Sequence, residues 1–253
     1  MKILSEPADI SSIAFDINAS GTVVGDRRKP GWRSSHAFIW SATEGMRDVE
    51  LPSYFSIAYA INDLGQVVGA TNDPDDNVMH VFLREADGSV KDLGILDGFY
   101  DMRPMAISNR GEIGGYAEGL VPGSKETRTT LFKWKEGKLS DIGWFNDHIL
   151  YDLSMNNEGV IVGCAVPNKE PPRRFYHEFI HKKRHVNRAF IYREGRLNYL
   201  NDLLPRGSIW ENLHDAHDIN DRGQIVGRGT VKGLGHRGFL LTPIEDQETK
   251  PIR

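Results

Sequence analysis

The chain has 253 residues, of which 39% are hydrophobic, and its formal net charge is -4. It is long enough to bury a sizeable core, and its charge gives no global reason to expect binding to nucleic acid or to an anionic membrane. No apolar run approaches the ~20 residues of a membrane span, residues 1–7 are too polar for a secretory signal, and a single cysteine excludes an intramolecular disulfide.

One sequence motif recurs along the chain: an apolar residue, Asn or Ser, a short polar turn, Gly, and a short apolar run that ends in a second Gly. Its five copies cover residues 17–25, 61–69, 107–115, 155–163 and 219–227. The closing glycines of successive copies are 44, 46, 48 and 64 residues apart. A period in the forties is typical of stacked or radial repeat folds.

The second copy shows the predicted elements of one repeat in chain order. Residues 56–61 and 66–69 are two strand-like runs, and the turn at 62–65 suits a type I turn followed by Gly in the left-handed region. Residues 80–84 and 90–94 follow as a third and a fourth strand, with no helical period. In the other copies the fourth strand is expected at 47–49, 140–143 and 201–203. The third strand recurs around Phe38, Phe82, Phe132, Phe190 and Phe239.

Four-stranded repeats of this length predict an all-β fold, a five-bladed β-propeller whose radial closure protects the sheet edges. The repeats lie at approximately 8–51, 52–97, 98–145, 146–205 and 206–243, in one domain of residues 1–243 followed by a charged tail at 244–253. The fifth repeat lacks a fourth strand, and residues 1–7 precede the first repeat. We therefore expect the N-terminal strand to complete the C-terminal blade and close the ring. A flat β-solenoid is the alternative, although its coils are usually shorter.

The strand His36-Ala37-Phe38, the Ile-Asn-x-x-Gly-x-Val-Val-Gly hairpin and the Asp-Leu-Gly ending resemble the HAF repeats of bacterial proteins described as probable extracellular. The resemblance covers nearly the whole chain, although His-Ala-Phe is intact only in the first copy. It bears on fold and implies no particular activity. The sequence as it stands, with Cys164 alone, fits a reducing compartment such as the cytoplasm. An extracellular or periplasmic location would require that a signal peptide has been removed.

The links between successive repeats are rich in aromatic side chains. These links, residues 52–57, 94–103, 143–151 and 205–215, share one face of a propeller with the loops between second and third strands. Aromatic rings beside carboxylates suit a sugar ring or a peptide, which they hold by stacking and hydrogen bonding. The alternative is that each ring plugs the wedge between two blades. The predicted ligand-binding residues are Tyr54, Tyr100, Asp101, Trp144, Asp147, His148, Trp210 and His214.

The loop between the second and third strands of the fourth copy is an insertion, residues 164–187, with six Lys or Arg against two Glu. It contains the pattern His-Glu-x-x-His, so on a helix His177 and His181 would share a face and hold Zn²⁺, with Glu178 as a base and His185 as a third ligand. The basic residues 182–184 would repel a cation. The alternative is an exposed amphipathic helix whose basic side attracts an acidic partner.

Two aspartates occupy equivalent positions on the predicted innermost strands of the first and last copies. Ring closure would make these copies neighbours, so the carboxylates of Asp16 and Asp218 would approach each other near the axis. A pair of carboxylates is what glycoside hydrolysis needs. The alternative is that each carboxylate accepts backbone amide hydrogen bonds at the end of its strand.

These patterns predict a binding module rather than an enzyme. We expect a glycan or a protein or peptide ligand on the loop-rich face, no membrane or nucleic-acid partner, and a monomer. One alternative is a glycoside hydrolase-like enzyme that uses Asp16 and Asp218. The other is a metal site at His177, Glu178 and His181. No cofactor is expected, apart from zinc under that second alternative.

Overall fold

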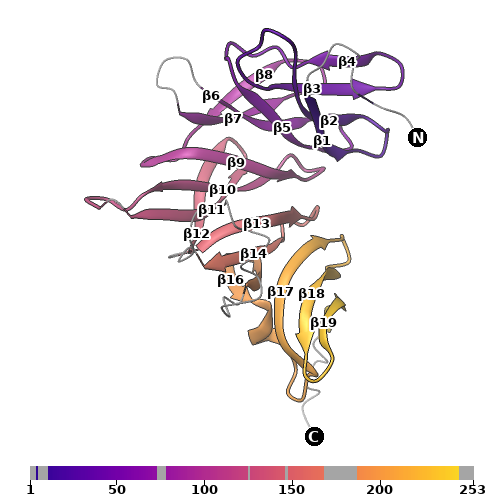
Figure 1. The fold of residues 1–253 in the computed structure, drawn as a ribbon, viewed down its shortest axis with the longest axis vertical. Coiled ribbons are helices and arrows are strands. Elements are labelled where there is room, and N and C mark those ends of the chain that lie inside the picture. The colour runs from indigo at the N-terminus through magenta and orange to yellow at the C-terminus, as the bar shows by residue number, and fades with distance from the viewer. Residues whose placement is uncertain are drawn as a thin grey trace, which may run out of the picture.

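The computed structural model describes Leu4 and residues 11–72, 78–124, 126–145, 148–167 and 187–244. These residues form antiparallel β-strands and one short 3-10 turn (Figure 1). No helix in this part of the chain is long and apolar enough to cross a membrane. The prediction of an all-β chain is therefore confirmed.

Each repeat copy forms one group of consecutive antiparallel strands, and we number the groups one to five. Group one contains β1 (Ser11–Ile17), β2 (Val23–Arg28), β3 (His36–Ser41) and β4 (Gly45–Asp48). Group two contains β5 (Ser56–Ile61), β6 (Val67–Asn72), β7 (Met79–Arg84) and β8 (Val90–Gly94). Group three contains β9 (Phe99–Ile107), β10 (Ile113–Leu120), β11 (Thr127–Lys135) and β12 (Lys138–Phe145).

The last two groups differ from this pattern. Group four contains β13 (His148–Met155), β14 (Ile161–Pro167), β15 (Arg188–Arg193) and β16 (Arg196–Tyr199), followed by the 3-10 turn Leu200–Leu203. Group five has three strands among the described residues, namely β17 (Trp210–Ile219), β18 (Ile225–Val231) and β19 (Gly235–Leu241).

Two predicted boundaries in the fourth copy are wrong. The fourth strand lies at β16 rather than at 201–203, because the two-residue turn of Glu194 (φ 52°) and Gly195 (φ 76°) starts the return strand at once. The insertion predicted to begin at residue 164 begins later, because β14 continues through Pro167 and pairs Cys164 with Ala189 of β15. Residues 168–186 lie outside the described part of the chain.

The two signature residues of the repeat, the closing Gly and the Phe of the third strand, are cross-strand partners. Gly69 of β6 lies opposite Phe82 of β7, and a Cβ at Gly69 would lie 2.5 Å from the Phe82 ring and 2.1 Å from the carbonyl oxygen of Ile57. The same pairing occurs in every copy, and all five Phe side chains are buried. Each repeat therefore needs Gly at this position to admit its central ring.

The groups pack face to face in chain order, with an apolar core in each seam. Val24 of group one packs with Phe82 of group two, and Val162 of group four packs with Leu213 and Phe239 of group five. Two further clusters fill the seams between groups two and three and between groups three and four. A parallel pairing of Met79 with Asp101 also joins groups two and three into one eight-stranded sheet.

The Asn of the repeated turn has two tasks in groups one, two and four. Its side-chain oxygen closes its own turn, as where Asn62 Oδ1 accepts from the backbone N–H groups of Leu64 and Gln66. Its side-chain nitrogen reaches the next group, as where Asn62 Nδ2 donates to the carbonyl oxygen of Ser108 at 2.9 Å. The predicted role as a turn former is therefore correct, and the same side chain also ties adjacent groups together.

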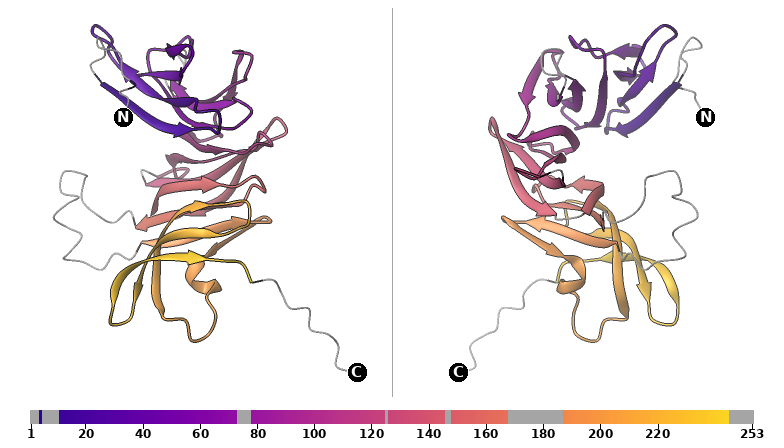
Figure 2. Two further views of the ribbon diagram at one scale, coloured as in Figure 1. Left: turned by 90° about the vertical axis from the view of Figure 1, so that its right-hand side faces the viewer. Right: turned by 60° about the vertical axis from the view of Figure 1, so that its left-hand side comes forward.

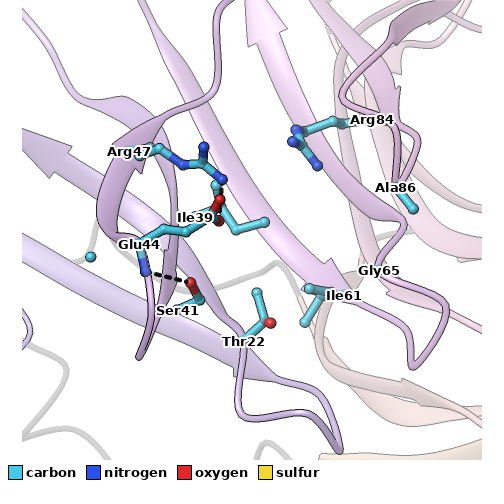
Figure 3. A pocket seen from close by; sticks show the side chains of 10 residues that line it. Thr22, Ile39, Ser41, Glu44, Arg47, Ile61, Gly65, Arg84 and Ala86 are labelled. Atoms are coloured by element: carbon cyan, nitrogen blue, oxygen red, sulfur yellow. Dashed lines mark hydrogen bonds and ion pairs between the residues drawn. The ribbon is translucent and has the colours of Figure 1, made fainter.

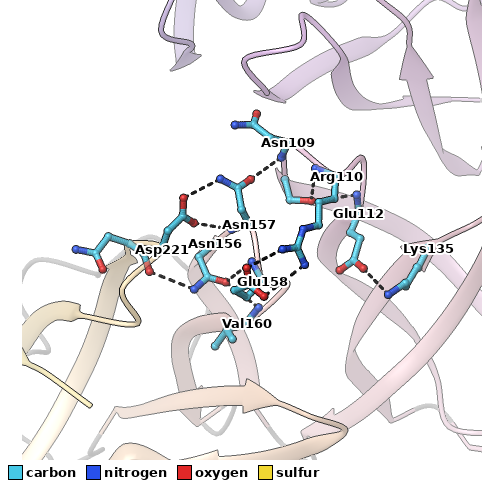
Figure 4. A network of polar contacts seen from close by, with 11 residues as sticks. Asn109, Arg110, Glu112, Lys135, Asn156, Asn157, Glu158, Val160 and Asp221 are labelled. Carbon is cyan, nitrogen blue, oxygen red and sulfur yellow. Dashed lines mark hydrogen bonds and ion pairs between the residues drawn. The ribbon is translucent and has the colours of Figure 1, made fainter. Parts of the chain in front are cut away.

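A second set of hydrogen bonds runs beside the Asn side chains, and we call these bonds the turn ladder (Figure 4). In each rung, the backbone N–H that follows the Asn or Ser donates to an Asp or Asn side chain of the next group. The four rungs are Ala19 N to Asp63 Oδ1 at 2.9 Å, Asp63 N to Asn109 Oδ1 at 2.9 Å, Asn109 N to Asn157 Oδ1 at 2.6 Å and Asn157 N to Asp221 Oδ1 at 2.8 Å.

The groups follow an arc whose two ends do not join, with β1–β4 at one end and β17–β19 at the other (Figure 2). The prediction of a closed ring is therefore wrong. One physical reason lies in the turn ladder: the first copy has Ala19 where later copies have Asp or Asn, so group one offers no side-chain acceptor for a rung from group five.

Of the N-terminal strand predicted to complete the C-terminal blade, residues 1–7, the structure describes Leu4 alone, and this residue does not lie beside β19. Leu4 packs against Val23, Phe38 and Met46 on the outer face of group one. In a closed ring that face would be covered by group five. Because the arc is open, no strand of group five lies there, and Leu4 packs on the buried cluster of Val23, Phe38 and Met46 instead.

Candidate functional site

Three side chains of group three form a stack on one face of the sheet. The guanidinium carbon of Arg128 lies 4.3 Å from the ring centroid of Phe99 and 4.5 Å from that of Trp144. Trp144 is 52% exposed, so its ring is accessible to a ligand. We call this arrangement the Arg128 stack; a planar cation between two rings is a favourable cation–π geometry.

Strand register builds the Arg128 stack. Gly119 of β10 lies opposite both Phe99 of β9 and Arg128 of β11, and Trp144 of β12 lies opposite Thr130. A Cβ at Gly119 would lie 2.9 Å from the Phe99 ring, so the absence of a side chain on β10 lets the flanking residues meet. The stack therefore crosses four strands with its exposed ring at the edge.

The Arg128 side chain has no counter-charge beside it in the part of the chain that the structure describes. Among the described residues it makes no ion pair or hydrogen bond, and its Nε is covered and unpaired. The backbone at Gly98 has φ of +81°, and a Cβ there would lie 3.1 Å from Arg128 Nη2. Gly98 therefore leaves space beside the Nη2 edge, the part of the group that can donate to a carboxylate.

Tyr100 and Asp101 follow Phe99 on β9, and only one of the two side chains is open. Tyr100 is 41% exposed. Asp101 is instead paired with Arg103, whose Nη2 lies 2.7 Å from Asp101 Oδ2 and whose Nη1 donates to the Tyr116 hydroxyl at 3.1 Å. Burial raises the pKa of nearby Tyr59 to about 12, although the Arg103 charge acts in the opposite direction. The Asp101 carboxylate is therefore paired within the fold and is not free to bind a ligand.

Other predicted ligand-binding residues are used inside the fold or stand apart. Trp210 packs edge-on against Phe239, with ring centroids 5.9 Å apart, and so plugs group five as the wedge alternative expects. Tyr54 is 56% exposed, in the link between groups one and two. Asp147 and the side chain of His148 lie outside the described part of the structure. The predicted face is therefore not one continuous set, and of the predicted residues that the structure describes only Trp144 contacts Arg128.

His214 is held within group five by neutral partners. Its Nε2 lies 2.7 Å from Thr230 Oγ1 and its Nδ1 lies 2.9 Å from Asn212 Nδ2, so Nδ1 is the acceptor. The ring also contacts the ring of His236 edge-on. Burial lowers the pKa of His214, and the charge of Asp215 only partly offsets this effect. His214 is therefore a neutral structural side chain near neutral pH.

Next to His214 lies a buried polar centre that sequence patterns did not reveal. The Asp215 carboxylate accepts from Arg228 Nη2 at 2.6 Å, from Asn187 Nδ2 at 3.1 Å and from Cys164 Sγ at 3.1 Å. Burial raises the pKa of Asp215, but these partners outweigh burial and hold it below its usual range. Burial and the Asp215 charge raise the pKa of the Cys164 thiol well above its usual range. This centre joins groups four and five and leaves the thiol unreactive.

The two aspartates of the hydrolase alternative both hold strands together. Asp16 accepts from the backbone N–H groups of Ile17 and Ile61, each at 2.8 Å, and so ties β1 to β5. Asp218 accepts from Ile219 N at 2.9 Å and from Ser154 Oγ at 2.6 Å, and so ties β17 to β13. Burial raises the pKa of Asp16, the backbone hydrogen bonds lower it, and the charge of Asp218 raises it further. The contacts are those that the strand-end alternative predicts.

The residues of the predicted metal site, His177, Glu178, His181 and His185, lie outside the described part of the chain. Within the described part, no group of three or more His, Cys, Asp or Glu side chains is arranged to hold a metal ion.

Two shallow hollows lie in consecutive seams on the side of the repeated turns. One, of 190 Å³, lies between groups one and two, where Arg47 and Arg84 extend over Thr22 and Ile61 (Figure 3). The other, of 350 Å³, lies between groups two and three and is lined by Trp134 among others. Because they occupy equivalent places in the repeat, they are consequences of how the groups stack.

Comparison with known proteins places the fold. No family model matches the chain, and no curated protein matches it. The chain is similar to the β-propeller domain of the Trilobed protease from Pyrococcus furiosus, with a TM-score of 0.58 and 12% identity over 92% of this chain and 68% of that chain. It is also similar to an oligogalacturonate lyase from Vibrio parahaemolyticus, with a TM-score of 0.54 and 11% identity over 95% of this chain and 68% of that chain.

At these identities the likeness concerns fold alone, and it supports a β-propeller type of architecture. The resemblance to HAF repeats stays a prediction that rests on the motif residues.

Proposed function

We propose that this chain is a ligand-binding module of β-propeller type, whose five strand groups are five blades, and that the Arg128 stack binds a carbohydrate bearing a carboxylate. One observation carries the proposal: Arg128 is clamped between Phe99 and Trp144 and has no counter-ion among the described residues, while the outer ring of Trp144 is half exposed. A guanidinium that has no ion-pair partner and lies beside an accessible ring is unusual for a purely structural contact.

The two exposed parts of the site have complementary chemistry. The face of Trp144 offers a flat apolar surface for the C–H face of a sugar ring. The Nη edge of Arg128 offers a fixed fork of N–H donors, which suits a carboxylate better than a hydroxyl does. A uronic-acid residue combines both requirements within one ring.

The test compares two tryptophans that sequence patterns alone treat as equal. Trp144→Ala should weaken binding of a glucuronate-containing oligosaccharide by at least about tenfold, as measured by calorimetry, because the stacking surface is lost. Its melting temperature should stay close to that of the wild type, since the ring is half exposed. Trp210→Ala should instead lower stability by roughly 2–3 kcal/mol, because this ring packs on Phe239, and should retain binding while folded.

Two results would contradict the proposal. One is that the wild-type protein binds neither acidic nor neutral oligosaccharides. The other is that a folded Trp144→Ala protein binds as the wild type does. Binding of acidic peptides with no binding of glycans would reject the carbohydrate assignment and retain the site.

A further inference from the structure

The last strand of group five, β19, lacks the neighbour that every other third strand has. The strands β3, β7, β11 and β15 each pair with a fourth strand on their outer side. Within the described residues, β19 pairs with β18 alone. His236, Arg237 and Gly238 are exposed along its length. Such an edge is a template for a further strand.

The intact groups show what kind of strand fits this edge. In groups one to three the Asp of the fourth strand lies directly opposite the central Phe, as Asp92 lies opposite Phe82. An aliphatic residue stands two positions before this Asp and another directly after it. The three segments are residues 46–49 (Met-Arg-Asp-Val), 90–93 (Val-Lys-Asp-Leu) and 139–142 (Leu-Ser-Asp-Ile).

In groups two and three the third strand supplies a polar partner for this Asp, two residues before the Phe, whereas Asp48 of group one pairs with Arg27 and Lys29. His80 Nδ1 lies 2.9 Å from Asp92 Oδ2 in group two, and Thr130 Oγ1 donates to Asp141 in group three. Group five has Arg237 at this position. Its Nη1 donates to the neighbouring carbonyl oxygen of His236, so the guanidinium lies at the exposed edge.

We infer that the open edge of β19 binds an extended segment of a partner protein by β-strand addition, with the pattern aliphatic-x-Asp-aliphatic. The segment runs antiparallel to β19, its Asp opposite Phe239 and paired with Arg237. Backbone hydrogen bonds give the affinity, and the Asp sets the register. The surface lies in group five and does not involve the Arg128 stack of group three.

The occupant is a partner rather than a known part of this chain. The three fourth-strand segments of the chain are already paired within their own groups as β4, β8 and β12. Other described segments that fit the pattern are held elsewhere, such as residues 61–64 in a repeated turn, 150–153 in β13 and 200–203 in the 3-10 turn. Leu4, from the predicted closing strand, packs at the opposite end of the arc on group one. A second copy of the chain holds all these segments in the same strands and turns, so it offers no free extended donor among the described residues.

A peptide titration on the full chain tests the inference. The probe is a fluorescein-labelled peptide with the sequence of residues 88–96, Gly-Ser-Val-Lys-Asp-Leu-Gly-Ile-Leu. Anisotropy should show saturable binding below about 1 mM, and replacing the peptide Asp by Lys should weaken it at least about tenfold. Arg237→Glu should weaken binding of the original peptide similarly, with an unchanged melting temperature. The matched control Arg222→Glu, an exposed arginine in the turn of the same group, should bind as the wild type does.

Hydrogen exchange identifies the occupant. The amides of β19 should exchange faster than those of β7 in the free protein and become protected when the peptide is added. Protection without peptide at every protein concentration would mean that the chain fills its own edge, and protection that grows with concentration would mean that a second copy fills it. Either result, or no peptide binding up to about 1 mM, overturns the inference.

Discussion

The ring of Phe82 occupies the space that a side chain at Gly69 would need, and the two residues lie directly opposite each other on β7 and β6. This relationship links the two signature residues of the repeat, and it recurs in all five copies. It explains why a motif that reads as a hairpin closed by Gly is always followed by a strand centred on Phe.

The Gly69–Phe82 pair predicts an asymmetric response to alanine. Gly69→Ala should destabilise the protein by at least about 1–3 kcal/mol, because the new Cβ meets both the ring and the Ile57 carbonyl oxygen. Gly143→Ala is the matched control, since a Cβ there has no neighbour closer than 3.6 Å. Urea denaturation measures both. Equal stability of the two variants would contradict this account of the repeat.

The Asn of the repeated turn should contribute more to the free energy of unfolding in an inner group of the arc than in the last group. Asn62→Asp keeps the oxygen that closes the turn but removes the amide donor to Ser108, so we expect a loss of about 1–3 kcal/mol. Asn220→Asp changes the same repeat position at the end of the arc, where the amide donates to Gln224 and the side chain is exposed. Its expected loss is below about 0.5 kcal/mol. A larger loss at Asn220 than at Asn62 in denaturation experiments would show that the amide does not act between groups.

Stability should fall as the pH drops below the ordinary pKa of histidine. The pKa of folded His214 lies below the ordinary histidine value of 6.5, mainly because of burial, so the unfolded chain binds a proton more readily than the folded one. The free energy of unfolding therefore decreases as the pH falls through 6.5 and levels off below the folded pKa. Denaturation curves at pH about 7.5 and about 5.5 should differ less for His214→Gln than for the wild type. An identical pH dependence in both proteins would count against this assignment.

The sequence predicts the strand order well because each repeat carries its own local signals. The Asn-x-x-Gly turns, the closing Gly and the Phe strand can all be recognised in the amino-acid sequence, and the structure confirms the strands around them. The prediction of ring closure rests instead on the number of strands, because the fifth repeat lacks a fourth strand and residues 1–7 precede the first repeat. It failed because Ala19 lacks the acceptor of the turn ladder and because Leu4 finds an apolar surface on group one.

The candidate site was only partly visible in the sequence. The sequence predicts Trp144 as a ligand-binding residue because it is aromatic and lies in a link between repeats. The same pattern predicts Trp210, which the structure places against Phe239. Residue type does not distinguish a plug from an exposed ring. No sequence pattern indicates Arg128 as a binding residue, because its position depends on Gly119, which allows contact with Phe99 across the strands.

The most direct test of the central claim is the affinity ratio between a glucuronate-containing oligosaccharide and its carboxyl-reduced, neutral form. For the wild-type protein, calorimetry should give a ratio of at least about tenfold in favour of the acidic form. Arg128→Gln should bring the ratio close to one while the protein stays folded, and Arg222→Gln, which changes the same charge elsewhere, should leave it unchanged. An acidic preference that survives in Arg128→Gln would contradict the claim that the Arg128 stack is the binding site.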